Sequence, residues 1–199
     1  VPFTCDELAV HIALLAEESG IKDHNIKIEV DISGHSMMYL NPTHYPSAEQ
    51  YKKGVRTDLF RGERKNPNIK MMDHELRDAT NKAIKSGDLY EVFLVNRDGI
   101  ITEGSRSNVF FIKNGEVYTS PTDTVLPGVT RTVIIKILED AGIPLHYSAI
   151  KQGELSGFDA AFISGTSPKV LPVASIGDIV YDVDDPVLRF VMAQYNILL

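Results

Sequence analysis

The sequence predicts a mixed α+β fold in which short strands, paired as hairpins, outnumber the helices. Asp98-Gly99 and Asn114-Gly115 each separate two runs rich in β-branched and aromatic residues, which is the pattern of a tight hairpin. A third pair of such runs flanks Gly177-Asp178. Helical patterns do not follow every strand, so a doubly wound parallel sheet is not predicted.

The composition indicates an ordinary folded protein with a sizeable core. Of the 199 residues, 43% are apolar and 24% are charged, which are typical values for globular domains. The formal net charge of −7, with no basic run, argues against nucleic acid as a partner. Cys5 is the only cysteine, and no apolar stretch is long enough to span a membrane. We therefore expect a cytoplasmic protein without an internal disulfide.

Residues 1–45 are expected to form part of a small domain and the linker that follows it. A capping box at Thr4 and apolar residues at helical spacing up to Gly20 predict a helix. Strict alternation over residues 26–32 predicts a half-buried strand. Two prolines within residues 41–46 predict the linker.

Residues 46–199 are expected to form a second, larger domain. Apolar residues on one side of 72–86, followed by Gly87, predict a helix, and residues 132–141 before Gly142 predict another. The strands predicted in this domain are 90–95, 108–112, 116–119, 160–163 and 170–176.

Several common kinds of catalytic site are missing from the sequence. The six histidines are scattered, and no pair of them has the spacing of metal ligands. There is no Gly-x-Ser-x-Gly elbow, no Gly-x-Gly-x-x-Gly fingerprint and no Walker loop. The thiol of Cys5 lies in a predicted helix cap without an obvious base. Neither a metal site nor a nucleophilic triad is predicted.

Two loops of small residues are candidates for holding a phosphate. Gly128, Val129 and Thr130 precede a predicted helix, where backbone amides and the Thr130 hydroxyl could face an anion. Thr130 could equally serve only as the cap of that helix. Residues 164–167 (Ser-Gly-Thr-Ser) offer the same groups after an apolar strand, although such loops are also common as plain turns.

Glu103 is a carboxylate in an apolar setting. It lies between an apolar strand and Gly104, where a charge without a hydrogen-bond donor would be costly. A protonated ring nitrogen of a bound cofactor would be such a donor. A backbone amide in a turn would also satisfy it, and the residues alone do not separate these two possibilities.

Three segments together resemble the class IV, or fold type IV, pyridoxal phosphate enzymes. They are residues 102–110 (Thr-Glu-Gly-Ser-Arg-Ser-Asn-Val-Phe), residues 126–131 (Leu-Pro-Gly-Val-Thr-Arg) and residues 165–173. This family includes branched-chain aminotransferases, D-amino acid aminotransferases and aminodeoxychorismate lyases. The resemblance covers residues 46–199 and implies pyridoxal 5'-phosphate as cofactor, amino acid and 2-oxo acid substrates, and at least a homodimer.

The resemblance also implies roles for individual residues. Lys70, upstream of Glu103, would be the catalytic lysine that forms a Schiff base with the cofactor, and Lys65, Lys82 and Lys85 fit that position less well. Glu103 would pair with the pyridine nitrogen. The implied cofactor-binding residues are Lys70, Glu103, Ser107, Asn108, Gly128, Val129, Thr130 and Thr166. The implied substrate-binding residues are Thr166 and Ser167.

The sequence departs from the family pattern at two places. Family members usually carry Thr or Ser and then Asn after the lysine, with a Tyr nearby, whereas residues 71–74 here read Met-Met-Asp-His. Family chains also begin with a segment that carries an arginine for the cofactor phosphate, and no such segment precedes Val1. We therefore expect an incomplete amino terminus, with residues 1–40 as the remainder of the small domain.

The leading hypothesis is a pyridoxal phosphate-dependent aminotransferase that moves an amino group between an amino acid and a 2-oxo acid. The first alternative is aminodeoxychorismate lyase, which uses the same groups to form 4-aminobenzoate and pyruvate. The second is a truncated domain of this family that does not catalyse. The identity of the substrate and the stereochemistry at its α-carbon stay open.

Overall fold

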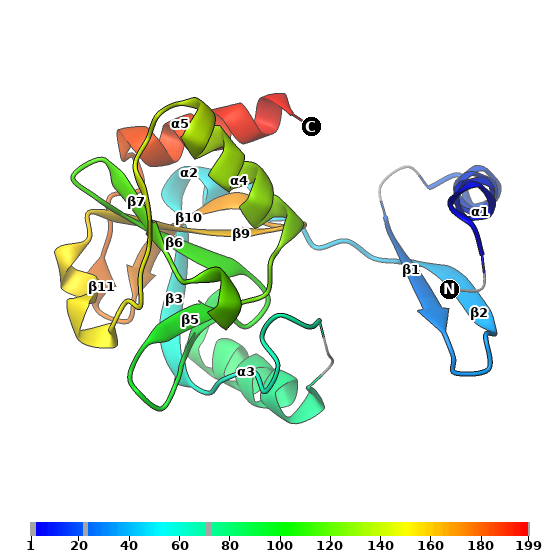
Figure 1. The fold of residues 1–199 in the computed structure, drawn as a ribbon, viewed down its shortest axis with the longest axis horizontal. Coiled ribbons are helices and arrows are strands. Elements are labelled where there is room, and N and C mark those ends of the chain that lie inside the picture. The colour runs from blue at the N-terminus through cyan, green and yellow to red at the C-terminus, as the bar shows by residue number, and fades with distance from the viewer. Residues whose placement is uncertain (1–2, 22–23, 71–72, 199) are drawn as a thin grey trace. The chain divides into compact units, whose positions relative to one another are not determined.

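The computed structural model describes residues 3–21, 24–70 and 73–198. The chain divides into two compact units, Val1–Tyr45 and Pro46–Leu199 (Figure 1). Within the described residues, no helix combines the length and the apolar character needed to cross a lipid bilayer.

The smaller unit consists of one helix and one hairpin. α1 spans Cys5–Ser19; Thr4 caps its start, and Gly20 follows its end in the left-handed conformation. These ends confirm the predicted helix. β1 (Asn25–Val30) pairs antiparallel with β2 (Ser36–Asn41).

The predicted strand over residues 26–32 is too long. It stops at Val30 because the Asp31 carboxylate accepts hydrogen bonds from the amides of Ser33 and His35, and these close a turn. The chain then returns as β2, a strand that the sequence does not predict.

The larger unit is built on a mixed sheet that contains nine strands in the described residues (Figure 1). The strand order is β5-β4-β3-β10-β9-β6-β7-β8, and β11 pairs with β10. The strands are β3 (Val55–Arg61), β4 (Glu91–Val95), β5 (Ile101–Gly104), β6 (Asn108–Lys113), β7 (Glu116–Thr119), β8 (Leu145–Tyr147), β9 (Ala160–Gly165), β10 (Lys169–Ile176) and β11 (Ile179–Val180). β3 runs parallel to β4 and β10, and β7 runs parallel to β8. The predicted α+β class and its hairpins are confirmed.

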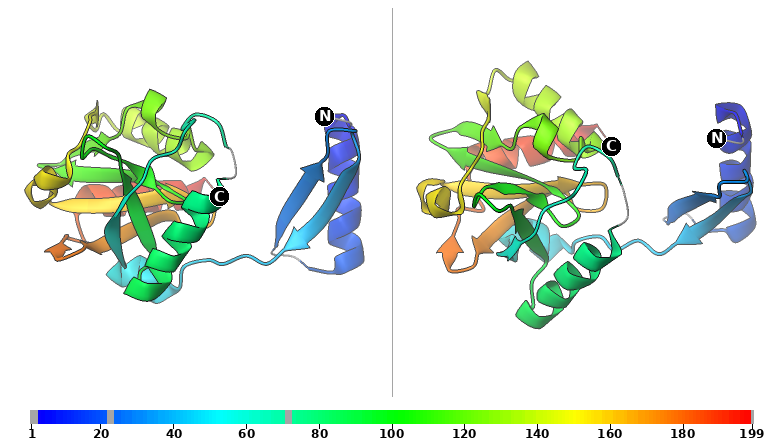
Figure 2. Two further views of the ribbon diagram at one scale, coloured as in Figure 1. Left: turned by 90° about the horizontal axis from the view of Figure 1, so that it is seen from below. Right: turned by 60° about the horizontal axis from the view of Figure 1, so that its bottom comes forward.

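Helices cover both sides of this sheet. α4 (Val129–Asp140) and α5 (Pro186–Ile197) lie side by side on one side in the views of Figures 1 and 2, and α3 (His74–Gly87) lies on the other side. The shorter helical segments are α2 (Ala48–Lys53), η1 (Thr122–Thr124) and η2 (Gln152–Gly157).

The central strands are buried on both faces. Val109 and Phe111 of β6 belong to one apolar core, whereas Phe110 and Ile112 belong to a second core under α4 and α5. Phe110 stacks on Phe162 of β9 with ring centroids 4.8 Å apart. Burial on both faces explains why these strands appear in the sequence as continuous apolar runs.

α3 begins later than its predicted range of 72–86. The helix starts at His74, and the Asp73 side chain caps it by accepting a hydrogen bond from the Leu76 amide. Residues 71 and 72, where the sequence departs from the family pattern, lie outside the described residues.

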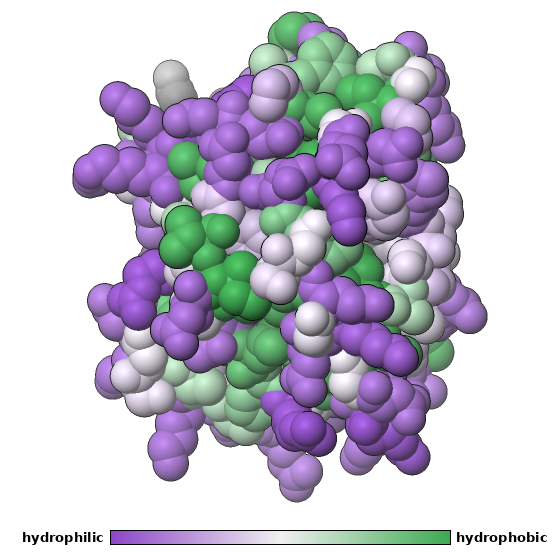
Figure 3. Space-filling model, turned by 90° about the vertical axis from the view of Figure 1, so that its left-hand side faces the viewer, coloured by the Kyte–Doolittle hydropathy of each residue, from purple (hydrophilic) through white to green (hydrophobic). Residues whose placement is uncertain are grey.

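One face of the molecule is predominantly hydrophilic. Figure 3 shows polar side chains over most of this face, with small apolar areas between them.

Candidate active site

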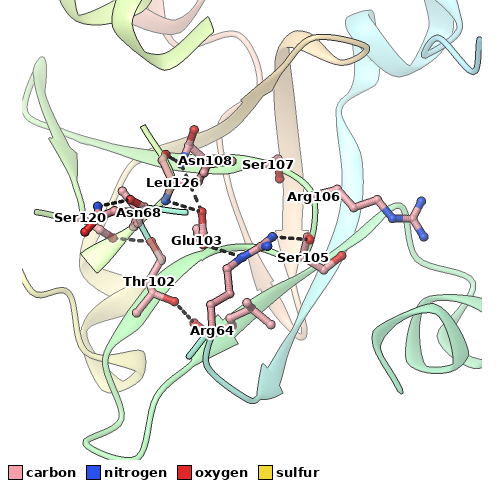
Figure 4. Close-up of polar contacts among 12 residues, drawn as sticks. Arg64, Asn68, Thr102, Glu103, Ser105, Arg106, Ser107, Asn108, Ser120 and Leu126 are labelled. Atoms are coloured by element: carbon pink, nitrogen blue, oxygen red, sulfur yellow. Dashed lines mark hydrogen bonds and ion pairs between the residues drawn. The ribbon is translucent and has the colours of Figure 1, made fainter. Parts of the chain in front are cut away.

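Glu103 lies near the end of β5 and is only 3% exposed (Figure 4). Its Oε1 forms an ion pair with Arg64 Nε at 2.8 Å. Its Oε2 accepts hydrogen bonds from the Leu126 amide at 3.1 Å and from Asn108 Nδ2 at 3.4 Å. The buried acid expected from the sequence is therefore present, and one ion pair and two hydrogen bonds from three separate segments reach it.

Arg64 is a site residue that the sequence reasoning missed. It lies in the loop after β3, and its Nη2 also donates a hydrogen bond to the Ser105 carbonyl at 2.9 Å. The guanidinium thus links Glu103 to the loop that follows it. The available signal was indirect: a buried carboxylate requires a strong donor, and arginine offers several donors in a fixed geometry.

Burial and neighbouring groups change the pKa of Glu103 in opposite directions. Loss of solvent raises the pKa of the Glu103 carboxyl above its ordinary value, and this is the largest effect. The Arg64 guanidinium and the Leu126 amide oppose that rise. The result is a pKa above 4.5, the ordinary value.

This raised pKa predicts that the free energy of unfolding falls as pH increases. Between the ordinary pKa of 4.5 and the raised value, the folded state binds more protons than the unfolded state, so rising pH favours unfolding. A Glu103→Gln variant does not titrate at this position and should lose that part of the slope. Urea unfolding of both proteins between about pH 4 and pH 7 measures the difference. If the free energies of unfolding of the two proteins change in parallel with pH across that range, the prediction is contradicted.

Asn108 connects the segments that the sequence singles out. Its Nδ2 donates to the Leu126 carbonyl at 2.9 Å and also reaches Glu103. In the sheet it stands opposite Ser164 of β9. A Cβ atom on Gly128 would come within 2.5 Å of Asn108 Oδ1. The Glu103, Gly128 and Ser164 segments therefore meet around one buried asparagine.

A side chain at residue 128 is expected to disrupt the junction around Asn108, where the Glu103, Gly128 and Ser164 segments meet. In a Gly128→Ala variant the methyl group must displace the Asn108 amide, so we expect a loss of about 1–3 kcal/mol in the free energy of unfolding. Gly153→Ala is a matched control because a Cβ there has no neighbour within 4 Å. Urea unfolding of both variants makes the comparison, and equal stabilities would show that the contact at residue 128 is unimportant.

The predicted phosphate loop is the start of α4. Gly128 is the N-cap and Val129 is the first helical residue, so the alternative in which Thr130 caps this helix is wrong. Val129 is 80% exposed. Amides in a first helical turn have no acceptor inside the helix, so this open end can receive an anion. The Thr130 hydroxyl instead lies in the interior, where it accepts a hydrogen bond from Tyr195 at 3.4 Å.

The second candidate loop is the turn between β9 and β10. Thr166 is exposed and Ser167 is partly buried in this turn. A Cβ on Gly165 would lie 3.7 Å from the Arg106 carbonyl, so the turn runs beside the loop that follows Glu103. The Ser164 hydroxyl just before it is buried and has no hydrogen-bond partner in the described part of the chain.

Lys70 is exposed at the end of a loop that is fixed to the site at two points. Asn68 Nδ2 donates to the carbonyls of Thr122 at 2.8 Å and Val125 at 2.9 Å. Arg64 fixes the other end of the loop through Glu103. A cleft of about 310 Å³ beside this loop is lined by Arg64, Lys65, Asn66, Ile69, Asp73, His74 and Glu75.

Ser107 faces the protein interior. Its hydroxyl donates a hydrogen bond to Glu91 Oε2 at 2.9 Å. A contact between Ser107 and a cofactor stays a prediction, as do the roles expected for Lys70, Thr166 and Ser167.

The residues present fit a pyridoxal phosphate group. A carboxylate offers roughly four acceptor positions, and two hydrogen bonds and one ion pair reach Glu103, which leaves room for a ring N–H. The ion pair with Arg64 favours the ionised acceptor that such a donor needs. The open start of α4 suits a phosphate. Within the described ranges, no three His, Cys, Asp or Glu side chains gather as a metal site would require.

Comparison with curated proteins identifies related aminotransferases. The chain is 26% identical over 191 residues to a probable branched-chain-amino-acid aminotransferase from Rickettsia felis. The match covers 88% of this chain and 66% of that protein. The chain thus spans just under two thirds of the length of this relative.

Comparison with solved structures shows the same fold. The branched-chain amino acid aminotransferase of Escherichia coli aligns over 100% of this chain and 73% of its own, with a TM-score of 0.83 and 23% identity. A putative 4-amino-4-deoxychorismate lyase from Legionella pneumophila aligns over 98% and 77%, with a TM-score of 0.82 and 18% identity. The family model for amino-transferase class IV matches residues 1–176. The chain therefore belongs to the class IV aminotransferase family.

Proposed function

We propose that this chain acts as a pyridoxal phosphate-dependent aminotransferase, which moves an amino group between an amino acid and a 2-oxo acid. The observation that carries the proposal is the junction around Asn108. There a buried, arginine-paired acid lies beside the open start of a helix. An acceptor for a ring nitrogen and a site for a phosphate are thus close together.

Each part of the site has a separate task in this proposal. The bound cofactor supplies a ring that withdraws electrons from the substrate α-carbon. Glu103 accepts the hydrogen bond from the ring nitrogen, and Arg64 keeps the carboxylate ionised so that the proton stays on the nitrogen. The start of α4 and Thr166 hold the phosphate from two sides. Ser107 and Asn108 complete the cofactor pocket, and Thr166 and Ser167 receive the substrate.

Lys70 provides the reacting amine. Its Nζ would attach the cofactor covalently in the resting enzyme and would later remove the proton from the substrate α-carbon. A loop fixed at Arg64 and Asn68 suits this task because proton transfer requires a well-placed base.

Cofactor binding can be tested directly on the purified chain. We expect an absorption band in the visible range after addition of pyridoxal 5'-phosphate. Borohydride should then fix the cofactor to the protein, and mass spectrometry of the digested protein should find the added mass on Lys70. A colourless protein that cannot be reconstituted would instead support a domain of this family that does not catalyse.

The choice between transfer and elimination needs a second assay. The solved lyase-like structure supports the fold alone, so aminodeoxychorismate lyase stays the alternative. Candidate amino acids with 2-oxoglutarate should yield the matching 2-oxo acids if the chain is a transaminase. Release of pyruvate from aminodeoxychorismate would indicate the lyase. Branched-chain substrates, a homodimer and a cytoplasmic location are parts of the same proposal.

A further inference from the structure

Glu91 is a second buried acid, and the proposed mechanism does not use it. It is the first residue of β4 and is 3% exposed. Its Oε1 accepts hydrogen bonds from the Ser105 amide at 3.2 Å and the Ser105 hydroxyl at 2.6 Å. Its Oε2 accepts from the Arg106 amide at 3.1 Å and the Ser107 hydroxyl at 2.9 Å. These four donors all come from three consecutive residues.

The loop of residues 104–107 therefore wraps around a carboxylate of its own protein. Consecutive amides and hydroxyls that point to one place form a typical anion site. Here Glu91 fills that site, so these four donors point at a carboxylate of the same chain. The packing is tight as well, since a Cβ on Gly104 would overlap the Ser107 hydroxyl and lie 3.0 Å from Glu91 Oε2.

The same loop separates two residues of the candidate site. Glu103 precedes it, and Asn108 follows it. Arg64, which pairs with Glu103, also donates to the Ser105 carbonyl within the loop. The path of the loop thus determines where the acid, its arginine and its asparagine lie (Figure 4).

We propose that Glu91 is a positioning residue that fixes Glu103 and Asn108 by holding the loop of residues 104–107. The inference rests on the proposed function for its effect on catalysis. The hydrogen bonds that carry it are independent of any cofactor.

A Glu91→Gln variant separates this role from simple packing. The side chain keeps its size, but one oxygen becomes an NH₂ group that faces at least two donors, so the loop must move. A shift of about 1 Å at a reacting group can cost about a hundredfold in rate. We expect kcat to fall by about that factor while KM for the amino acid changes little, because Glu103 acts on the cofactor ring.

The experiment measures three properties of the full chain. The first is hydrogen exchange of residues 104–108 without cofactor, which should be faster in Glu91→Gln. The second is the pH dependence of the absorption band after addition of pyridoxal 5'-phosphate, which should shift. The third is the division of the catalytic loss between kcat and KM. Glu49→Gln is the matched control, because Glu49 is exposed and pairs with Lys53 on the same helix.

The outcomes separate this inference from the proposed function. Wild-type protein without an absorption band would overturn the proposed function, while faster exchange in Glu91→Gln would still support the loop-holding role. The inference would be overturned if a folded Glu91→Gln protein had the hydrogen exchange, the absorption band and the kcat of the wild type. If that variant fails to fold, Ser105→Ala removes one donor and retains the charge. It should then show the same three changes to a smaller degree, and their absence would also overturn the inference.

Discussion

Lys70→Ala is expected to lower turnover by at least about 10⁴-fold, because the variant loses the amine that we propose holds the cofactor and moves the α-proton. The fold should be retained. Lys70 is exposed, and exposed side chains usually change the free energy of unfolding by less than about 0.5 kcal/mol when removed. Steady-state kinetics with an amino acid and 2-oxoglutarate measure the first effect, and urea unfolding measures the second.

Lys65→Ala is the matched control for this experiment. Lys65 lies in the same loop and is also exposed, so it tests whether any lysine of the loop would have the same effect. Its replacement should leave turnover within a few fold of the wild type. Full activity in Lys70→Ala would show that another lysine reacts. Lys65, Lys82 and Lys85 are then the next candidates.

The hairpins of the larger unit could be predicted because short-range signals specify them. Gly99 and Gly115 adopt positive φ angles of 76° and 78°, which glycine reaches without strain. Their turns lie where the sequence places them, between β4 and β5 and between β6 and β7. A turn of this kind is decided by two residues, so little information from the rest of the fold is needed.

Some missed elements carried signals that were available. α5 begins with Asp185 as a capping residue and Pro186 in the first turn, a usual helix start. α2 begins with a capping box formed by Ser47 and Gln50. β3 is harder to recognise, because the buried Thr57 is polar and its hydroxyl donates a hydrogen bond to the Ser175 carbonyl, which is distant in the sequence.

In the candidate site too, some residues could be predicted from the sequence and others could not. A buried acid at residue 103 could be predicted because it lies between an apolar strand and a glycine. Its partner Arg64 could not, since many arginines and lysines are present and only the folded chain brings one of them within 2.8 Å. The same holds for Asn108, because its bonds to Leu126 join segments that are distant in the sequence. Contacts of this kind depend on the topology of the sheet.

Glu103→Gln is expected to lower kcat by about 10²–10³-fold, which is the usual cost of losing one preorganised electrostatic contact at a reacting centre. The amide is nearly the same size, but it has no charge to keep a proton on the ring nitrogen. Cofactor affinity should fall less than kcat, because the phosphate contacts proposed at the start of α4 would be unchanged. Glu116→Gln, at a partly exposed acid of β7 that pairs with His146, is the control and should have kinetics like those of the wild type.

Combining Glu103→Gln with Arg64→Gln tests whether the ion pair works as one unit. If Arg64 acts only by keeping Glu103 ionised and in place, its replacement should matter little once the acid is gone, so the effects on kcat should not add. The double variant is then expected to be about as slow as Glu103→Gln alone. Two losses that simply multiply would mean that Arg64 acts on the reaction by a route that does not pass through Glu103.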